Sequence, residues 1–160
     1  MKTALALLLS LPIVSPCFAD VPAGNAAYAA GDYDAAYQEW LESAEAGSAQ
    51  AQFNLGLLFE HGKGREIDLA QAATWYLQSA DGGFVRAQYA VARMYESGSG
   101  VERDFVQARK WYKLSGKQKY QDARKRKRRL ADKMTPEEIA LGDMWAREWE
   151  EAQAQKKRSE

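Results

Sequence analysis

Apolar residues in the middle of the chain recur at the three- and four-residue spacing of an α-helix, and the whole pattern occurs twice. Residues at this spacing lie on one face of a helix, so each stretch predicts a helix with one buried face. The first stretch has Ala51, Leu55, Leu58 and Phe59, and the second, 36 positions later, has Ala87, Val91, Met94 and Tyr95.

Each of these predicted helices ends at a pair of glycines, and a second helix is predicted to follow. The pairs are Gly62/Gly64 and Gly98/Gly100, and glycine readily adopts the left-handed conformation of a helix exit. Asp68 and Asp104 are expected to cap the second helices, since a glutamine follows each by three residues. The buried side of the first such helix is expected at Ala72, Trp75, Tyr76 and Ala80, and Gly47 and Gly83 are expected to close the second helices.

The repeat predicts an all-α fold, a short right-handed solenoid of helix-turn-helix units with capping helices at its C-terminal end. The offset of 36 also extends backwards without a gap to Asp32, Ala36 and Trp40. A single helix pair cannot bury such a face, whereas a stack of pairs can.

The spaced positions A-x3-LG-x2-[YF]-x2-G-x-G-x3-D-x3-A-x2-WY-x3-A-x2-G resemble the Sel1-like repeat, a relative of the tetratricopeptide repeat. The unit from Ala51 to Gly83 fits nearly throughout. The next unit departs from the pattern at Val91–Ala92, and again where Gly116 and Lys119 replace a late alanine and glycine. The resemblance implies a non-catalytic adaptor, because members of this family act as adaptors in membrane-associated and envelope complexes.

The ends of the chain differ from the repeats. Residues 1–19 have the basic start, short apolar run and small residues of a secretory signal peptide, so we expect cleavage near Ala19 and a periplasmic or secreted mature chain without cysteine. The solenoid is expected over residues 20–118, with a partial unit at about 24–47 and units at about 48–83 and 84–119. A basic helix and a capping helix are expected within 119–154, and a frayed tail over 155–160. Thr135, Pro136 and Glu138 predict the start of the capping helix.

Charge is unevenly distributed, and its strongest concentration is a run of six basic residues. The run is Arg124, Lys125, Arg126, Lys127, Arg128 and Arg129. It could be neutralised by residues 137–151, which carry six acids and one arginine, or it could meet an acidic protein. Peripheral contact with an anionic membrane surface or polymer is an alternative. Nucleic acid is not expected as a partner, since export removes most of it from reach.

Catalytic, metal and cofactor sites are not expected. His61 beside Glu60 is the only histidine, and a metal site needs several converging ligands. Glu39, Glu42 and Glu45 have the spacing of a solvated helix face. A wall-active enzyme using paired carboxylates remains a minor alternative.

The concave face of the solenoid is the predicted partner-binding site. In stacked helix pairs the first helix of each unit lines this face, and its positions outside the repeat pattern are free to specialise. These positions are Gln50, Phe53, Leu57, Glu60 and His61 in one unit, and Arg86, Tyr89, Arg93, Glu96 and Ser97 in the next. Phe53 and Tyr89 could instead belong to the core. The expected partner is an envelope protein or peptide; an envelope-surface or cell-wall binding protein acting through Arg124–Arg129, and self-association, are left open.

Overall fold

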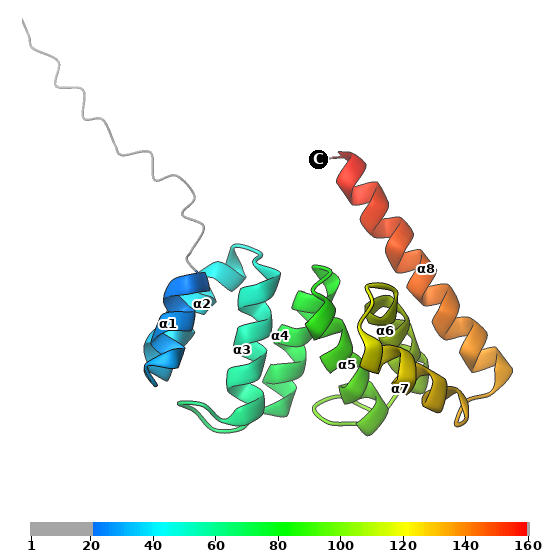
Figure 1. The fold of residues 1–160 in the computed structure, drawn as a ribbon, viewed down its shortest axis with the longest axis horizontal. Coiled ribbons are helices and arrows are strands. Elements are labelled where there is room, and N and C mark those ends of the chain that lie inside the picture. Colours follow the sequence, from blue (N-terminus) through cyan, green and yellow to red (C-terminus); the bar gives the residue numbers. More distant parts are fainter. Residues whose placement is uncertain (1–20, 160) are drawn as a thin grey trace, which may run out of the picture.

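The computed structural model describes residues 21–159, and every regular element in that part of the chain is an α-helix. The elements are α1 (Val21–Ala29), α2 (Tyr33–Glu45), α3 (Ala49–His61), α4 (Leu69–Asp81), α5 (Val85–Ser97), α6 (Phe105–Lys117), α7 (Gln121–Ala131) and α8 (Pro136–Ser159). Figure 1 shows α1 to α7 side by side in one row, with α8 running obliquely back over one end. The predicted all-α solenoid is confirmed, while the predicted signal peptide lies outside the described residues.

The predicted helix ends are formed by the expected residues. The Asp68 side chain accepts a hydrogen bond from the Gln71 amide at 2.9 Å, and Asp104 accepts one from the Gln107 amide at 3.0 Å. Gly62 and Gly98 end α3 and α5 in the left-handed conformation, with φ of 64° and 79°. These bonds satisfy amide groups that have no partner inside a helix.

Alanine and glycine positions in the core let helices approach each other, and large aromatic rings fill the space. Ala51, Ala87 and Ala108 are fully buried, and so are Tyr76 and Tyr112. Gly56 of α3 lies directly beneath Tyr76 of α4, where a Cβ atom would come within 2.5 Å of the ring. A larger residue at 56 would therefore force α3 and α4 apart.

Neighbouring units are joined by one recurring hydrogen bond. The Gln52 side chain donates to the carbonyl of Ala44 at 3.0 Å, and Gln88 donates to the carbonyl of Ala80 at 3.3 Å. Arg124 Nε donates to the Gly116 carbonyl at 2.8 Å. The three donors are each 36 residues apart, so α7 occupies the first-helix position of a further unit, although its basic sequence did not suggest a repeat.

The last helix, α8, begins as predicted but takes a different path from the second helices before it. Thr135 and Glu138 exchange the two hydrogen bonds of a capping box, at 2.8 and 3.2 Å. The helix then packs on α6, and Trp149 donates from Nε1 to the Asp81 carboxylate at 3.2 Å. It is helical through Ser159, beyond residue 154 where the capping helix was predicted to end, and the basic side chains at 156–158 suit a helix C-terminus.

Lys119 adopts a left-handed backbone conformation, with φ of 67°, at the position that Gly47 and Gly83 occupy in the earlier units. A side chain disfavours this conformation by about 1 kcal/mol relative to glycine. We therefore expect Lys119→Gly to raise the free energy of unfolding by up to about 1 kcal/mol, measured by chemical denaturation. Gly83→Ala should lower it by about 1 kcal/mol, since little surrounds that position. Equal stability of all three proteins would contradict this account.

Asp143 fastens α8 to α6 through a two-pronged ion pair with Arg109, at 3.0 Å for each bond. Burial alone would raise the pKa of Asp143, but the charges and hydrogen bonds of Arg109 and Lys113 outweigh burial and hold the pKa below its usual range. The stabilisation is therefore complete above the unfolded-state pKa of about 4 and is lost as the pH falls through the lower folded-state pKa.

We expect Asp143→Asn to be less stable than the wild type at neutral pH, with a difference that shrinks steadily below about pH 4. Denaturant titrations from about pH 2 to about pH 7 measure this difference. A difference that stays constant across this range would show that the carboxylate charge has no part in fastening α8.

Candidate protein-binding groove

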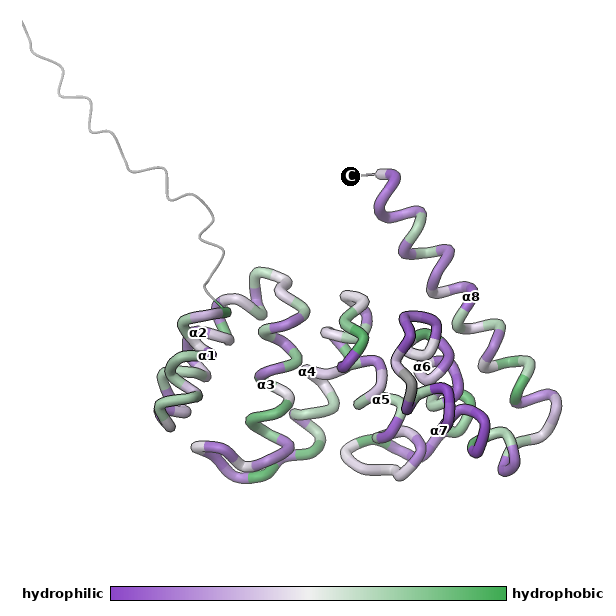
Figure 2. The backbone as a smooth tube through the Cα atoms, in the orientation of Figure 1, coloured by the Kyte–Doolittle hydropathy of each residue, from purple (hydrophilic) through white to green (hydrophobic). Residues whose placement is uncertain are grey.

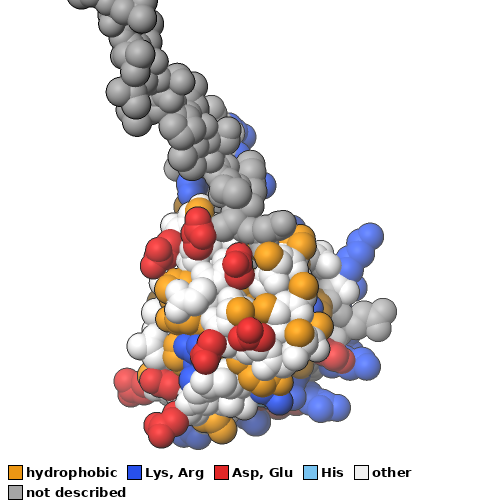
Figure 3. All heavy atoms as spheres, turned by 90° about the vertical axis from the view of Figure 1, so that its left-hand side faces the viewer, with side chains coloured by type: hydrophobic (Ala, Val, Ile, Leu, Met, Phe, Trp, Pro, Cys, Tyr) orange, Lys and Arg blue, Asp and Glu red, His pale blue; other side chains and the backbone are white. Residues whose placement is uncertain are grey.

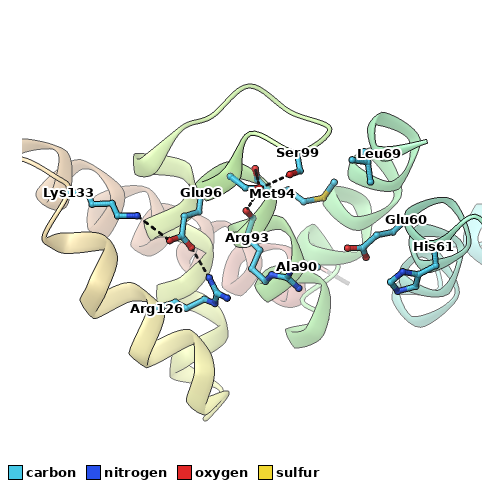
Figure 4. Close-up of a pocket in the computed structure, with 11 residues that line it drawn as sticks. Glu60, His61, Leu69, Ala90, Arg93, Met94, Glu96, Ser99, Arg126 and Lys133 are labelled. Atoms are coloured by element: carbon cyan, nitrogen blue, oxygen red, sulfur yellow. Dashed lines mark hydrogen bonds and ion pairs between the residues drawn. The ribbon is translucent and has the colours of Figure 1, made fainter. Parts of the chain in front are cut away.

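A groove of about 590 Å³ opens where α3, α5 and α7 meet near the ends of α3 and α5. Glu60 and His61 lie on one side, and Arg126 and Lys133 lie on the other (Figure 4). Arg93 of α5 stands between them. The groove is therefore built by the first helices of three successive units, which places it on the face predicted to be concave.

The structure brings together about half of the side chains that the sequence proposed for partner binding. Glu60, His61, Arg93, Glu96 and Ser97 all line the groove. They come from the last turns of α3 and α5, where a 36-residue repeat places equivalent positions next to each other.

The remaining proposed positions lie elsewhere. Phe53 is only 5% exposed and contacts the rings of Tyr76 and Phe84, so it belongs to the core and is not an accessible anchor. Leu57 is half-buried against the same core. The exposed residues Gln50 and Arg86 lie outside the groove, and the Arg86 guanidinium is 5.1 Å from the centre of the Phe53 ring.

Tyr89 is half-buried, in contrast to the equivalent Phe53. Its ring contacts Tyr112 and Tyr120, with centroid separations of 5.8 and 4.8 Å. Its hydroxyl accepts a hydrogen bond from Arg126 Nε at 3.0 Å. Tyr89 therefore supports the wall of the groove by holding Arg126 in place.

Two glutamates of the groove are fixed from below by buried tyrosines. Tyr76 donates to Glu60 at 2.5 Å and Tyr112 donates to Glu96 at 2.6 Å. Burial first, and then the hydrogen bond to the glutamate and its negative charge, raise the pKa of each tyrosine. Each hydroxyl thus stays protonated as a donor at neutral pH.

In the first unit a different pair of residues stands at these positions. Trp40 occupies the tyrosine position and Gly24 the glutamate position. Gly24 lies against the Trp40 indole so closely that no Cβ would fit. Trp40 donates instead to the Val21 carbonyl at 3.4 Å. The carboxylate row of the groove therefore starts at α3.

The charges of the groove are only partly paired. Glu96, whose side chain is 17% exposed, forms ion pairs with Arg126 at 3.3 Å and with Lys133 at 4.0 Å. Arg93 is exposed, and its side chain forms no hydrogen bond or ion pair with the described residues, although its carbonyl accepts a hydrogen bond from Ser97 at 2.9 Å. Leu69 and Met94 add apolar surface to the same groove. The arrangement can bind a carboxylate next to an apolar side chain.

The repeat family is settled by comparison with known proteins. The model of the Sel1 repeat matches residues 49–84 and 85–120. The crystal structure of a Sel1 repeat protein from Oxalobacter formigenes superposes with a TM-score of 0.62 and 35% sequence identity, over 69% of this chain and 89% of that one. The chain belongs to the Sel1 repeat family. Sel1 repeats generally act as non-catalytic scaffolds for protein–protein interaction.

Two further similarities involve much longer proteins. The Sel1-like structure of c5321, a protective antigen present in uropathogenic Escherichia coli strains, superposes with a TM-score of 0.76 and 27% identity, over 82% of this chain and 29% of that one. DAP3-binding cell death enhancer 1 of rat and of mouse is 45% identical over 42 residues. The matched segment is 26% of this Sel1 repeat chain and only 8% of those proteins.

The basic run on α7 of this Sel1 repeat protein is not neutralised by ion pairs from α8. Within residues 21–159 the α8 carboxylates Asp143 and Glu150 pair with residues of α6. Of the run itself, Arg126 pairs with Glu96, and Arg124 bonds to a backbone carbonyl. The exposed side chains Lys125, Arg128 and Arg129 have no partner in the described part of the chain. That these three side chains contact an anionic lipid, polymer or protein stays a prediction.

Some groove residues escaped the sequence analysis. Leu69, Ser99 and Lys133 lie at the start of α4 or in connections between helices, where the repeat pattern carries little information. Arg126 was named only as part of the basic run; continuing the offset of 36 from Ala90, which also lines the groove, would have placed it there.

The Sel1 repeat fold carries neither a metal centre nor a membrane span in its described part. No group of three or more histidine, cysteine, aspartate or glutamate side chains gathers there to hold a metal ion. None of the helices between residues 21 and 159 is both long and apolar enough to cross a membrane.

We expect Tyr112→Phe to lower the free energy of unfolding by about 1–2 kcal/mol, because Glu96 loses a donor in a poorly solvated position. Tyr95→Phe is the matched control, since the Tyr95 hydroxyl forms no hydrogen bond within the described residues. Chemical denaturation of both variants measures the effect. If the two variants were equally stable, the Tyr112–Glu96 hydrogen bond would have no role in supporting the groove.

Proposed function

We propose that the mature chain is an exported, non-catalytic adaptor that binds a segment of a partner protein in the groove between α3, α5 and α7. The observation that carries the proposal is the unpaired Arg93, which stands in the groove between the tyrosine-anchored carboxylates Glu60 and Glu96. A groove whose walls are already fixed loses little conformational entropy on binding.

The chemistry of the groove indicates the partner segment. Arg93 offers a guanidinium that can hold a carboxylate through two parallel hydrogen bonds. Leu69, which is 37% exposed, offers apolar contact in the same groove. The partner segment is therefore one with an acidic residue close to an apolar residue. Glu96 is already paired with Arg126 and Lys133, so a basic residue of the partner would gain little binding energy from it.

The proposed non-catalytic role is supported by the contacts of the two groove carboxylates. Glu60 and Glu96 both accept hydrogen bonds from buried tyrosines, and Glu96 is also ion-paired. A carboxylate held in this way serves as a structural support for the groove. The general scaffold role of Sel1 repeats agrees with this interpretation.

Export is supported by the signal-peptide layout of residues 1–19. In its native cell the protein should begin at Asp20 and be recovered from the periplasm or the medium. Mass determination of the purified native chain tests this; a retained Met1 in a cytosolic fraction would overturn it.

The groove is tested by placing a photoreactive amino acid at Ser97, inside the groove, or at Gln50, which is exposed outside it. After irradiation of the mature chain in its own cell envelope, a crosslinked partner should form from Ser97. In Arg93→Ala the crosslink should weaken about tenfold, as expected for the loss of a charge-assisted contact.

Arg86→Ala is the matched control, since Arg86 is an exposed arginine outside the groove, and it should leave the crosslink unchanged. Sequencing of the crosslinked peptide should give an acidic residue near an apolar one. Equal crosslinking from Gln50 and Ser97, or no crosslink from Ser97, would refute binding in this groove.

A further inference from the structure

A second groove, of about 550 Å³, lies between α6 and α7 and is lined almost entirely by basic side chains. Its basic residues are Arg109, Lys113, Lys117, Arg124, Lys127 and Arg128. Gly116 and Ala131 complete its lining. We call this the cationic groove. It shares no lining residue with the groove of the proposed function.

The charges of the cationic groove exceed what the fold neutralises. Asp143 pairs with Arg109 and Lys113, and Glu150 pairs with Lys117. Lys127 and Arg128 have no hydrogen bond or ion pair with the described residues. Burial, followed by the neighbouring Arg109 charge, lowers the pKa of Lys127. The repulsion between these neighbouring cations therefore opposes folding. A bound anion would reduce this repulsion.

The opposite end of the solenoid carries the opposite charge. Residues 21–62 include six acidic residues and no lysine or arginine. Three of them, Glu39, Glu42 and Glu45, lie along one side of α2 and line a shallow cavity of about 280 Å³ together with Leu41. None of the three side chains has a partner among the described residues. Figure 3 looks at this end, where acidic and hydrophobic side chains share the surface and basic ones lie toward its edges.

The two charged surfaces cannot meet within one molecule. Helix α2 lies at one end of the row of helices, and α6 and α7 lie toward the other (Figure 1). They can meet only between two copies, with the acidic end of one against the basic end of the next. The apolar stacking that joins units within the chain is not available for this contact, since α7 is strongly hydrophilic (Figure 2).

We propose that the chain associates head to tail, with α2 of one copy docked in the cationic groove of the next. The carboxylates of Glu39, Glu42 and Glu45 recur at intervals of three residues, and the cations of Lys113/Lys117 and Arg124/Arg128 recur at intervals of four. Both rows therefore repeat about once per helical turn, so a carboxylate row can face a cation row along its length. Such a contact leaves the other end of each copy free, so chains of more than two copies can form.

Association by this contact is measured by sedimentation velocity of the mature chain over a range of protein concentrations. Association should be present at low salt, where the Debye length exceeds about 10 Å, and weakened at least tenfold at about 1 M salt, where it is about 3 Å. One variant reverses the acidic end (Glu39→Lys, Glu42→Lys, Glu45→Lys). Another reverses the cationic groove (Lys117→Glu, Lys127→Glu, Arg128→Glu).

Each reversed variant should be monomeric by itself, because its two ends then carry like charges. An equal mixture of the two should associate again, since the native groove of one meets the native α2 of the other. This recovery separates a lost contact from a lost fold. The matched control for the acidic-end variant is Glu66→Lys, Glu102→Lys, Glu151→Lys, which changes the net charge by the same amount at exposed, unpaired positions. Because this control keeps the acidic residues of α2, it should still associate.

Three results would overturn the proposal: a wild-type chain that is monomeric at low salt, a reversed variant that still associates, or a mixture that fails to recover. Anionic phospholipid vesicles provide the alternative ligand. A wild-type chain that is monomeric but cosediments with these vesicles, and loses this property on groove reversal, would assign the groove to a membrane surface instead. Photocrosslinking from Ser97 tests the other groove separately, so the two ideas can fail independently.

Discussion

The hydrogen bond from the first helix of each unit to the end of the preceding second helix holds the solenoid in register. The last carbonyls of a helix have no partner within it, and here the next helix packs over them. The carbonyls of Ala44, Ala80 and Gly116 each accept one backbone amide from the turn that follows. The buried side chains of Gln52 and Gln88 supply a second donor from the next unit, and Arg124 supplies it in the last unit. A shorter or apolar side chain would remove this bond between units and leave the carbonyl with its backbone donor alone. The acceptor residues are small, Ala44, Ala80 and Gly116, so the two helices can approach closely enough for the bond to form.

Once this register is fixed, equivalent positions of successive units become neighbours in space. Ala90 and Arg126 both line the groove and are 36 residues apart. So are Glu60 and Glu96, each supported by a tyrosine that follows it by 16 residues. The groove is therefore a consequence of the repeat, while its specificity comes from positions that the repeat leaves free. Trp40 and Gly24 show that one unit can exchange a polar pair for an apolar one without changing the backbone plan.

The repeat, its caps and its all-helical fold could be predicted because they depend on local spacing. The burial of individual side chains could not be predicted from local spacing, as Phe53 and Tyr89 show. The two rings occupy the same repeat position and contact equivalent rings, Phe84 and Tyr120. Arg86 also lies over Phe53, whereas the equivalent position beside Tyr89 is Asp122. What covers a side chain depends on the side chains of the segment that packs over it, and the repeat pattern does not specify these.

The path of α8 shows a second limit of sequence reasoning. Three residues are enough for α2 to pack against α1, and four connect α7 to α8, so the length of the connection does not explain why α8 leaves α7. Helix α8 packs on α6 instead, and its carboxylates Asp143 and Glu150 reach the cations of that helix. Counting charges suggested neutralisation of α7, because a count cannot identify the helix that a carboxylate meets.

The position of α7 at the end of the stack explains why the densest run of basic residues in the molecule lies on this helix. Every inner helix of the stack covers its apolar face with the next unit, but the last has no successor. Its outward positions must be polar to remain soluble, and α7 meets this need with basic residues. Only Ala123 and Leu130 of this helix are buried apolar residues. At the other end of the row, α2 exposes acidic residues. A solenoid closed by ends of opposite charge avoids apolar stacking, but it retains an attraction between copies that salt can modulate.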